Sequence, residues 1–136
     1  MNVLEAVEKF TTMNDGLTFE KGTKNGYVEF ISKNASVGDL DDDVRIDITY
    51  YDNEILEVDF VFDRLDGNPM THSLIEEFNE SAMFLTAYIN EDNYLTIYAR
   101  CVTVTDGDDA FSFLMAVFSE LINKMNYLEP LAKLTV

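Results

Sequence analysis

Carboxylates recur at almost every second position between residues 41 and 63, in the stretch DDDVRIDITYYDNEILEVDFVFD. Side chains two residues apart in a β-strand point to the same face, roughly 6.7 Å from each other. Such a row is compatible with a metal site, a catalytic acid pair, an imitation of nucleic-acid charge, or the solvated face of a sheet. The residues that would form this acidic surface are Asp47, Glu57, Asp59 and Asp63.

The spacing of the carboxylates does not favour a metal site. Asp39 and residues 41–43 offer oxygen atoms, but an EF-hand loop needs alternating acidic positions, a glycine at its sixth position and a glutamate at its twelfth. No stretch of the chain has this register. Asp108 and Asp109 follow a loop, where they suit the first turn of a helix. The sequence therefore predicts no metal and no cofactor.

Carboxylate catalysis is the second possibility, because Asp47 and Asp59 are expected to lie opposite each other on paired strands. Two buried carboxylates at that distance would share a proton and raise one pKa. The other residues expected on that face are polar or charged, which indicates a solvated face: Arg45, Thr49, Glu57 and Asp63.

Nucleophilic chemistry has less support. His72 is the single histidine and is expected at the start of a helix, while Cys101 is the single cysteine and falls in an inward-facing row. None of the six glycines belongs to a phosphate-binding motif. The sequence therefore predicts no catalytic residue and a protein that is not an enzyme.

Alternating apolar residues predict three hairpins. LTFEK (17–21) and YVEFIS (27–32) flank Asn25-Gly26, a strong hairpin signal. In the second hairpin, Ile48 must pair with Val58 for both apolar rows to face one core, because a slip of one residue would invert one strand. This register leaves residues 52–54 as the loop, with Asn53 available for a left-handed conformation. It brings together the rows Val44, Ile46, Ile48, Tyr50 and Leu56, Val58, Phe60, Phe62.

The third hairpin follows the same plan. Its expected loop is Glu91-Asp92-Asn93, and its inward rows are Met83, Leu85, Ala87, Ile89 and Leu95, Ile97, Ala99, Cys101.

Helical spacing of apolar residues predicts three helices. The first covers residues 3–12 with Asn2 as its cap, and the second covers 71–81 with Thr71 or Ser73 as its cap. The third is long and begins after Thr105 or Asp106. Its core-facing stripe is Phe111, Leu114, Met115, Phe118, Leu121, Ile122 and Met125. The chain therefore reads as one α+β domain spanning residues 1–136, with an antiparallel sheet and the order α-ββ-ββ-α-ββ-α.

The net charge of −17 over 136 residues limits the kinds of partner. Nucleic acid and anionic membrane surfaces would be repelled, whereas a basic or neutral protein would be attracted. One cysteine excludes an internal disulfide, and no leader or membrane-spanning run is apparent. We therefore expect a soluble cytoplasmic protein.

From about residue 40 onward the chain resembles the YbjN family, bacterial proteins regarded as sensory transduction regulators, whose fold is like that of type III secretion chaperones. The resemblance rests on VRIDITYYDNEILEVDFVF, on LIEEFNESAMFLTAYINEDNYLTIYARCVTV and on DGDDAFSFLMAVFSELINKM. It covers roughly the last two thirds of the chain and consists of element order and core residues. It implies a compact α+β domain that binds another protein in a chaperone-like or regulatory manner, often as a dimer.

A row of aromatic residues is expected on the outward face of the third hairpin, together with one arginine. This composition is typical of the centre of protein interfaces. Either a helix of the same chain covers the row, or the row is a dimer seam or client groove. Helix 71–81 is a second candidate surface, and an acidic mimic that blocks a basic nucleic-acid-binding protein is the alternative function. The predicted partner-binding residues are Phe84, Tyr88, Tyr94, Tyr98 and Arg100.

Overall fold

The computed structural model describes residues 1–13, 16–37, 44–67 and 69–134. The carboxylates at 39 and 41–43 and the residues Asn14, Asp15 and Asn68, where breaks are predicted, lie outside these ranges. The elements are α1 (Val3–Thr12), β1 (Glu20–Lys24), β2 (Tyr27–Ala35), β3 (Val44–Tyr51), β4 (Leu56–Arg64), α2 (Pro69–Ser81), β5 (Thr86–Ile89), β6 (Tyr94–Cys101), α3 (Gly107–Asn123) and α4 (Met125–Ala132).

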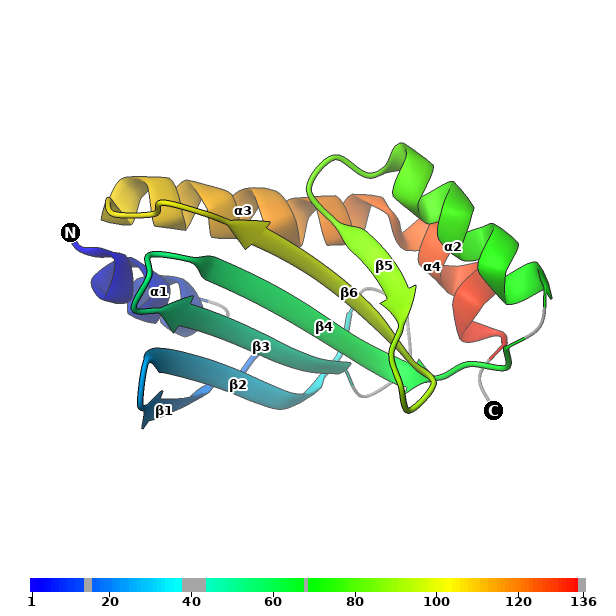
Figure 1. Ribbon diagram of the computed structural model, residues 1–136, viewed down its shortest axis with the longest axis horizontal. Helices are drawn as coiled ribbons and strands as arrows, with labels where there is room; N and C mark the ends of the chain where they lie inside the picture. Colours follow the sequence, from blue (N-terminus) through cyan, green and yellow to red (C-terminus); the bar gives the residue numbers. More distant parts are fainter. Residues whose placement is uncertain (14–15, 38–43, 68, 135–136) are drawn as a thin grey trace.

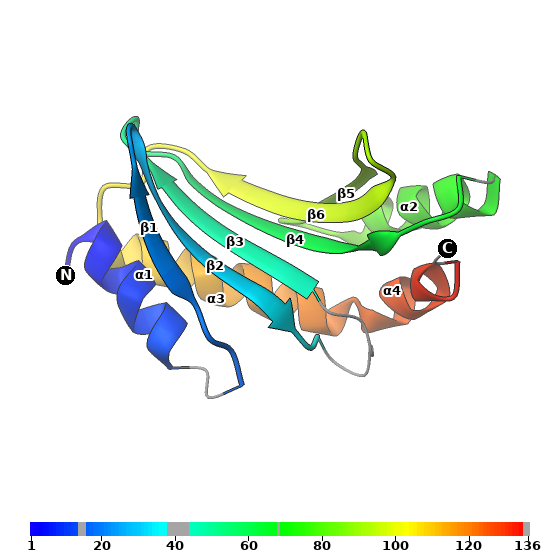
Figure 2. The ribbon, with the colours of Figure 1, turned by 90° about the horizontal axis from the view of Figure 1, so that it is seen from below.

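The six strands form one antiparallel sheet in the order β1-β2-β3-β4-β6-β5 (Figure 1). Figure 2 shows the sheet curving over α1 and α3, while α2 and α4 pack together at one end. Within the described ranges no helix lies on the opposite face of the sheet. The predicted α+β class is therefore confirmed, with a two-layer arrangement that leaves one sheet face open.

The predicted registers of the β3–β4 hairpin and of the β5–β6 hairpin are confirmed. Ile48 pairs with Val58 and Asp47 pairs with Asp59 in the first, and Ala87 pairs with Ile97 in the second. Both loops have three residues, as predicted. The left-handed residue of the first loop is Glu54 (φ 65°) rather than Asn53, whereas Asn93 takes this conformation in the second loop (φ 69°). In such loops the third position is left-handed, so the expectation for Asn53 was wrong.

The core lies between the inner sheet face and α1 with α3. The half-buried Phe118 of α3 packs against this core, with its ring centroid 4.8 Å from that of Phe10 of α1 and 5.1 Å from that of Phe60 of β4. Phe10 and Phe60 are buried. Burying such a side chain contributes about 1.5–3 kcal/mol, so this cluster ties the helices to the sheet.

The helix ends follow the sequence in two cases and not in the third. Asn2 and Glu5 form a reciprocal capping box at α1, and Asp106 accepts a hydrogen bond from the Asp108 amide at the start of α3. Helix α2 begins earlier than predicted, at Pro69, so Thr71 and Ser73 lie inside it and are not caps. Proline suits the first helical position because its missing N–H has no helical partner there.

Three apolar residues predicted in the core are exposed. Met83 is 84% exposed because β5 begins only at Thr86, and Met115 and Ile122 of α3 are 41% and 52% exposed. Helix α4 was not predicted, since its amphipathic pattern is short and contains Pro130. In the described part of the chain, no helix has the length and apolar character needed to cross a bilayer.

Candidate functional site

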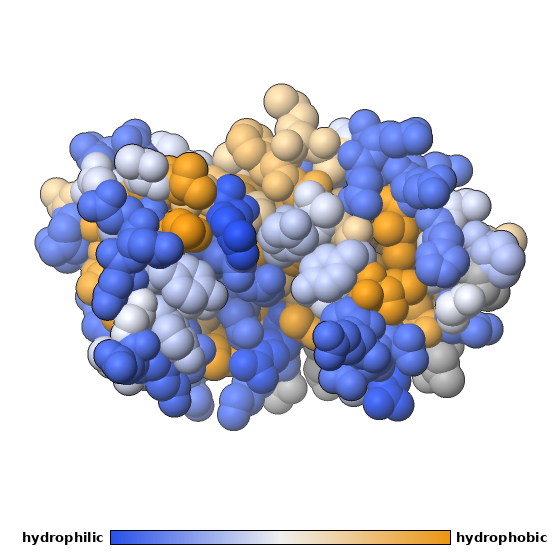
Figure 3. Space-filling view, in the orientation of Figure 1, coloured by the Kyte–Doolittle hydropathy of each residue, from blue (hydrophilic) through white to orange (hydrophobic). Residues whose placement is uncertain are grey.

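The open face of the sheet carries most of the predicted functional residues. Strand alternation turns Asp47, Glu57, Asp59, Tyr98 and Arg100 to this face, and the register sets them in two cross-strand rows. In one row Asp47 pairs with Asp59 and Asp59 pairs with Tyr98; in the next row Glu57 pairs with Arg100. Figure 3, which looks onto this face, shows mostly hydrophilic and intermediate residues with smaller apolar areas between them.

Two of the carboxylates have arginine partners on the same face. The Arg100 Nη2 atom lies 2.6 Å from a Glu57 carboxylate oxygen, and the Arg45 Nε atom lies 2.9 Å from an Asp47 oxygen. These hydrogen bonds raise the pKa of both arginines. The side chains of Asp47 and Glu57 are only 24% and 12% exposed.

Asp59 lies at the centre of this arrangement. Its pKa is raised to about 7, mainly by partial burial and then by the hydrogen bond and charge of Glu57 and the charge of Asp47. The charge of Arg100 opposes this shift. A carboxylate with this pKa is partly protonated at neutral pH. The expectation of a fully solvated acidic face is therefore wrong for these side chains, because strand pairing crowds them together; only Asp63 of the predicted four is exposed.

A shallow hollow of about 360 Å³ opens over Asp59 and is lined by Glu57, Asp59, Thr86, Tyr88, Tyr98 and Arg100. The rings of Tyr88 and Tyr98 are 5.7 Å apart and nearly perpendicular. Burial and then the charge of Asp59 raise the pKa of Tyr88, so the phenol stays protonated. The hollow thus combines aromatic rings with a carboxylate, an arrangement that suits a cationic group.

Tyr94 and Phe84 are not brought into the hollow. Tyr94 lies further along β6, where the guanidinium carbon of Arg64 is 5.3 Å from its ring centroid. Phe84 lies between α2 and β5, outside the sheet, and its backbone amide donates to a Glu120 carboxylate oxygen at 2.9 Å. Of the four predicted aromatic residues, the structure therefore brings only Tyr88 and Tyr98 together in the hollow.

His72 and Cys101 lie apart from the hollow. His72 is exposed on α2, and Cys101 is half-buried at the end of β6. Among the residues that the structure describes, no group of three or more His, Cys, Asp or Glu side chains is placed to hold a metal ion.

Tyr51 belongs to this face but was missing from the prediction. Its pKa is raised by burial and then by the charges of Glu57 and Asp59, and its ring centroid is 5.7 Å from that of Tyr27. The alternation that places Tyr50 inward would have placed Tyr51 outward. Strand alternation in the sequence was therefore enough to predict that Tyr51 lies on the open face.

Comparisons with protein-family models, with curated proteins and with solved structures each found nothing that matches this chain.

Proposed function

We propose that this protein is a binding module that receives a basic segment of another protein on the open face of its sheet. The observation that carries the proposal is the hollow over Asp59, in which Tyr88 and Tyr98 flank carboxylates on an uncovered face. Aromatic residues and arginine are enriched at the centres of protein interfaces. The charge of −17 would speed the approach of a basic partner.

Asp59 is the carboxylate available to a partner. Asp47 and Glu57 each have an arginine within salt-bridge distance, and no cationic group of the described residues lies within that distance of Asp59. A lysine or arginine side chain entering the hollow would contact the ring faces and favour the ionised form of Asp59. Binding would then release a proton, so affinity should rise as the pH increases toward and through about 7.

The resemblance to YbjN and type III secretion chaperones supports the same class of function, a chaperone-like or regulatory protein. The resemblance also implies a homodimer; a second copy carries the same charge of −17, so a dimer through the open face would compete with a basic segment for this surface, and sedimentation velocity distinguishes the two.

The test uses a library of short basic peptides and fluorescence anisotropy. We expect Tyr98→Ala and Tyr88→Ala to weaken the best peptide by about tenfold each, because rings at the centre of an interface contribute most. Tyr27→Ala, a tyrosine of the same face outside the hollow, is the matched control and should stay within about twofold. Equal losses in all three variants, or binding that does not change between pH 6 and pH 8, would contradict the proposal.

The alternative function, a nucleic-acid mimic, has less support from these side chains. A duplex presents one charge per about 1.7 Å of axis. Here Asp47 and Glu57 are neutralised by arginines and Asp59 is partly protonated near neutral pH. A mimic should bind a nucleic-acid enzyme in a manner that salt abolishes, and reversing the charge at Glu57, Asp59 and Asp63 should abolish that binding.

A further inference from the structure

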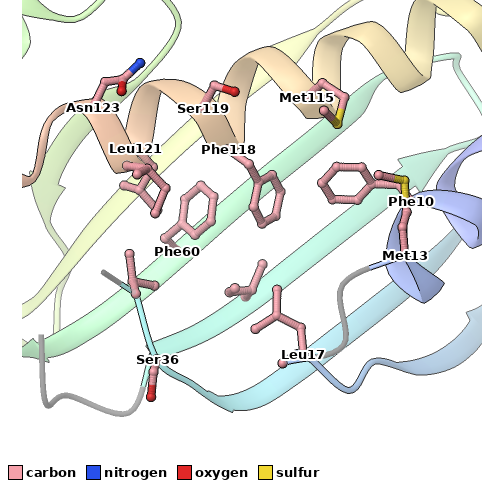
Figure 4. A pocket seen from close by; sticks show the side chains of 14 residues that line it. Phe10, Met13, Leu17, Ser36, Phe60, Met115, Phe118, Ser119, Leu121 and Asn123 are labelled. Carbon is pink, nitrogen blue, oxygen red and sulfur yellow. The ribbon is translucent and has the colours of Figure 1, made fainter. Parts of the chain in front are cut away.

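A second hollow lies on the other side of the sheet, between its inner face and α3. Its volume is about 590 Å³. Figure 4 shows side chains of α3 on one side of it, Phe60 of β4 behind, and Phe10 and Met13 at the end of α1. Leu17 and Ser36, from the segments beside β1 and β2, close the remaining side. The cavity is therefore walled by both layers of the fold.

The lining of this cavity is uncharged. None of its 14 residues is Asp, Glu, Lys or Arg, although 26% of the whole chain is charged. Its polar residues, Ser36, Ser119 and Asn123, are exposed and lie at its rim. A charged ligand would lose its hydration without gaining a charged partner, so the lining favours a neutral molecule.

The mouth of the cavity is lined by apolar side chains that the described residues leave exposed. Met13, Met115 and Ile122 all line it, and they are 46%, 41% and 52% exposed. Met115 and Ile122 belong to the predicted apolar stripe of α3, in which Leu114 and Leu121 are buried. The described residues cover this stripe only in part, and an apolar occupant would cover the remainder.

We infer that this cavity binds a neutral, largely apolar small molecule. Its volume lies within the range of about 300–1,000 Å³ that is typical of ligand pockets. A single turn of helix with its side chains occupies roughly 400 Å³, from a diameter of about 10 Å and a pitch of about 5.4 Å, so a helical peptide of several turns does not fit. The aromatic cluster of Phe10, Phe60 and Phe118 forms the apolar wall, and the two methionines can adapt to the shape of the ligand.

The probe for this site is N-phenyl-1-naphthylamine, a neutral dye whose fluorescence rises in apolar surroundings. We expect saturable binding of one dye per chain to the wild-type protein, with little dependence on salt. Ser119→Trp should weaken binding by about tenfold or more, because the indole would obstruct the mouth of the cavity. Ser112→Trp, at another exposed serine of α3 outside the lining, is the matched control and should bind like the wild type.

A measurement on the unaltered protein gives a second test. In methyl NMR spectra, the dye should shift the signals of Met13, Met115 and Ile122 and leave those of Met83 and Val102, which are exposed apolar residues outside the cavity. Dye binding that is not saturable, equal affinities of the two tryptophan variants, or equal shifts at Met83 would each overturn the inference. None of these outcomes bears on the peptide site of the open face.

Discussion

The β3–β4 hairpin lies in the middle of the sheet between β2 and β6, whereas β5 of the β5–β6 hairpin is an edge strand. Both hairpins have three-residue loops and inward apolar rows. The outer side of β5 has no neighbouring strand among the described residues, and side chains of α2 and α3 instead bond backbone groups of this strand and of the residues just before it. The Asn79 side chain bonds both backbone groups of Ala87, and the Glu120 carboxylate accepts from the amides of residues 83–85.

The two hairpins therefore depend on different interactions. Both hairpins have buried inward rows, but the middle hairpin is paired along both sides, whereas the outer side of β5 depends on a few polar side chains from helices. Covering an edge in this way also prevents it from pairing with another chain. The predictions below test this difference, from the largest expected effect to the smallest.

Phe60→Ala should cause the largest loss of stability. Phe60 is fully buried in β4 and contacts Phe118, so its truncation removes apolar burial and leaves a cavity. We expect a loss of about 3–5 kcal/mol in the free energy of unfolding, measured by urea denaturation. Val61→Ala, on the half-buried outer face of the same strand, is the control, with an expected loss of about 1 kcal/mol or less. Similar losses for both variants would refute the view that the inner face of β4 contributes more to stability than its outer face.

Glu120→Ala should destabilise the edge hairpin. The change removes the acceptor for the amides of Met83, Phe84 and Leu85, with N–O distances of 2.8–2.9 Å. Hydrogen bonds to a charged group contribute about 1.5–3 kcal/mol, and partial exposure reduces this, so we expect a loss of about 2 kcal/mol. Hydrogen exchange at these amides should accelerate more than exchange in β3.

Two further variants serve as comparisons for the loss of stability expected in Glu120→Ala. Glu120→Gln keeps one acceptor oxygen and should lose about half as much stability. Glu77→Ala, an exposed glutamate of α2, should have almost no effect. If exchange accelerated equally in both hairpins, the edge would not be a separate unit.

Asp59→Asn should stabilise the protein at pH 8 but not at pH 4. The pKa of Asp59 is raised in the folded state to about 7, so the folded protein binds the proton more tightly than the unfolded chain does. Stability is therefore lost as pH rises from about 4 to about 7. Asparagine resembles the protonated acid and avoids this loss, which we estimate as about 1–2 kcal/mol after allowing for partial exposure.

The measurement is the difference in unfolding free energy between variant and wild type at pH 4 and pH 8. Asp63→Asn, at an exposed carboxylate of the same strand, controls for the general change in charge. A difference that is the same at both pH values would show that Asp59 is not the titrating group.

The register of both hairpins could be predicted from the sequence because strand alternation allows one solution. Ile48 and Val58 can face one core only in the observed pairing, and the same holds for Ala87 and Ile97. That register also fixed which carboxylates lie together. It did not reveal the environment of Asp59, since burial by neighbouring tyrosines and arginines depends on which strands become neighbours.

The order of the strands in the sheet could not be predicted from the alternation of apolar residues. Tyr98 lies beside Asp59 because β6, not β5, pairs with β4. The exposure of Met115 and Ile122 was missed for a related reason, because helical spacing gives the direction of a stripe and not how far the sheet covers it. Both misses concern long-range packing, and both fall at the two candidate sites.

The loops of the two hairpins differ in how well their residues suit a left-handed backbone. Asn93 tolerates φ near 69°, and the Asn90 side chain accepts hydrogen bonds from the amides of Asp92 and Tyr94. The first loop has Glu54 at the equivalent position (φ 65°), and it is held from outside, because the Val104 amide donates to the Glu54 carbonyl at 2.8 Å.

Glu54→Asn should therefore stabilise the protein slightly, by about 0.5 kcal/mol, because asparagine lowers the cost of the left-handed conformation and leaves the backbone bond to Val104 in place. Glu54→Gly should give a similar gain, since the release of strain exceeds the entropy that glycine adds to the unfolded chain. Asn93→Ala should cost about 1 kcal/mol, because alanine has no side chain to compensate for φ > 0. Thermal melts of the three variants would detect these differences, and unchanged stability in Glu54→Asn would mean that the external bond, rather than the loop residue, sets the conformation.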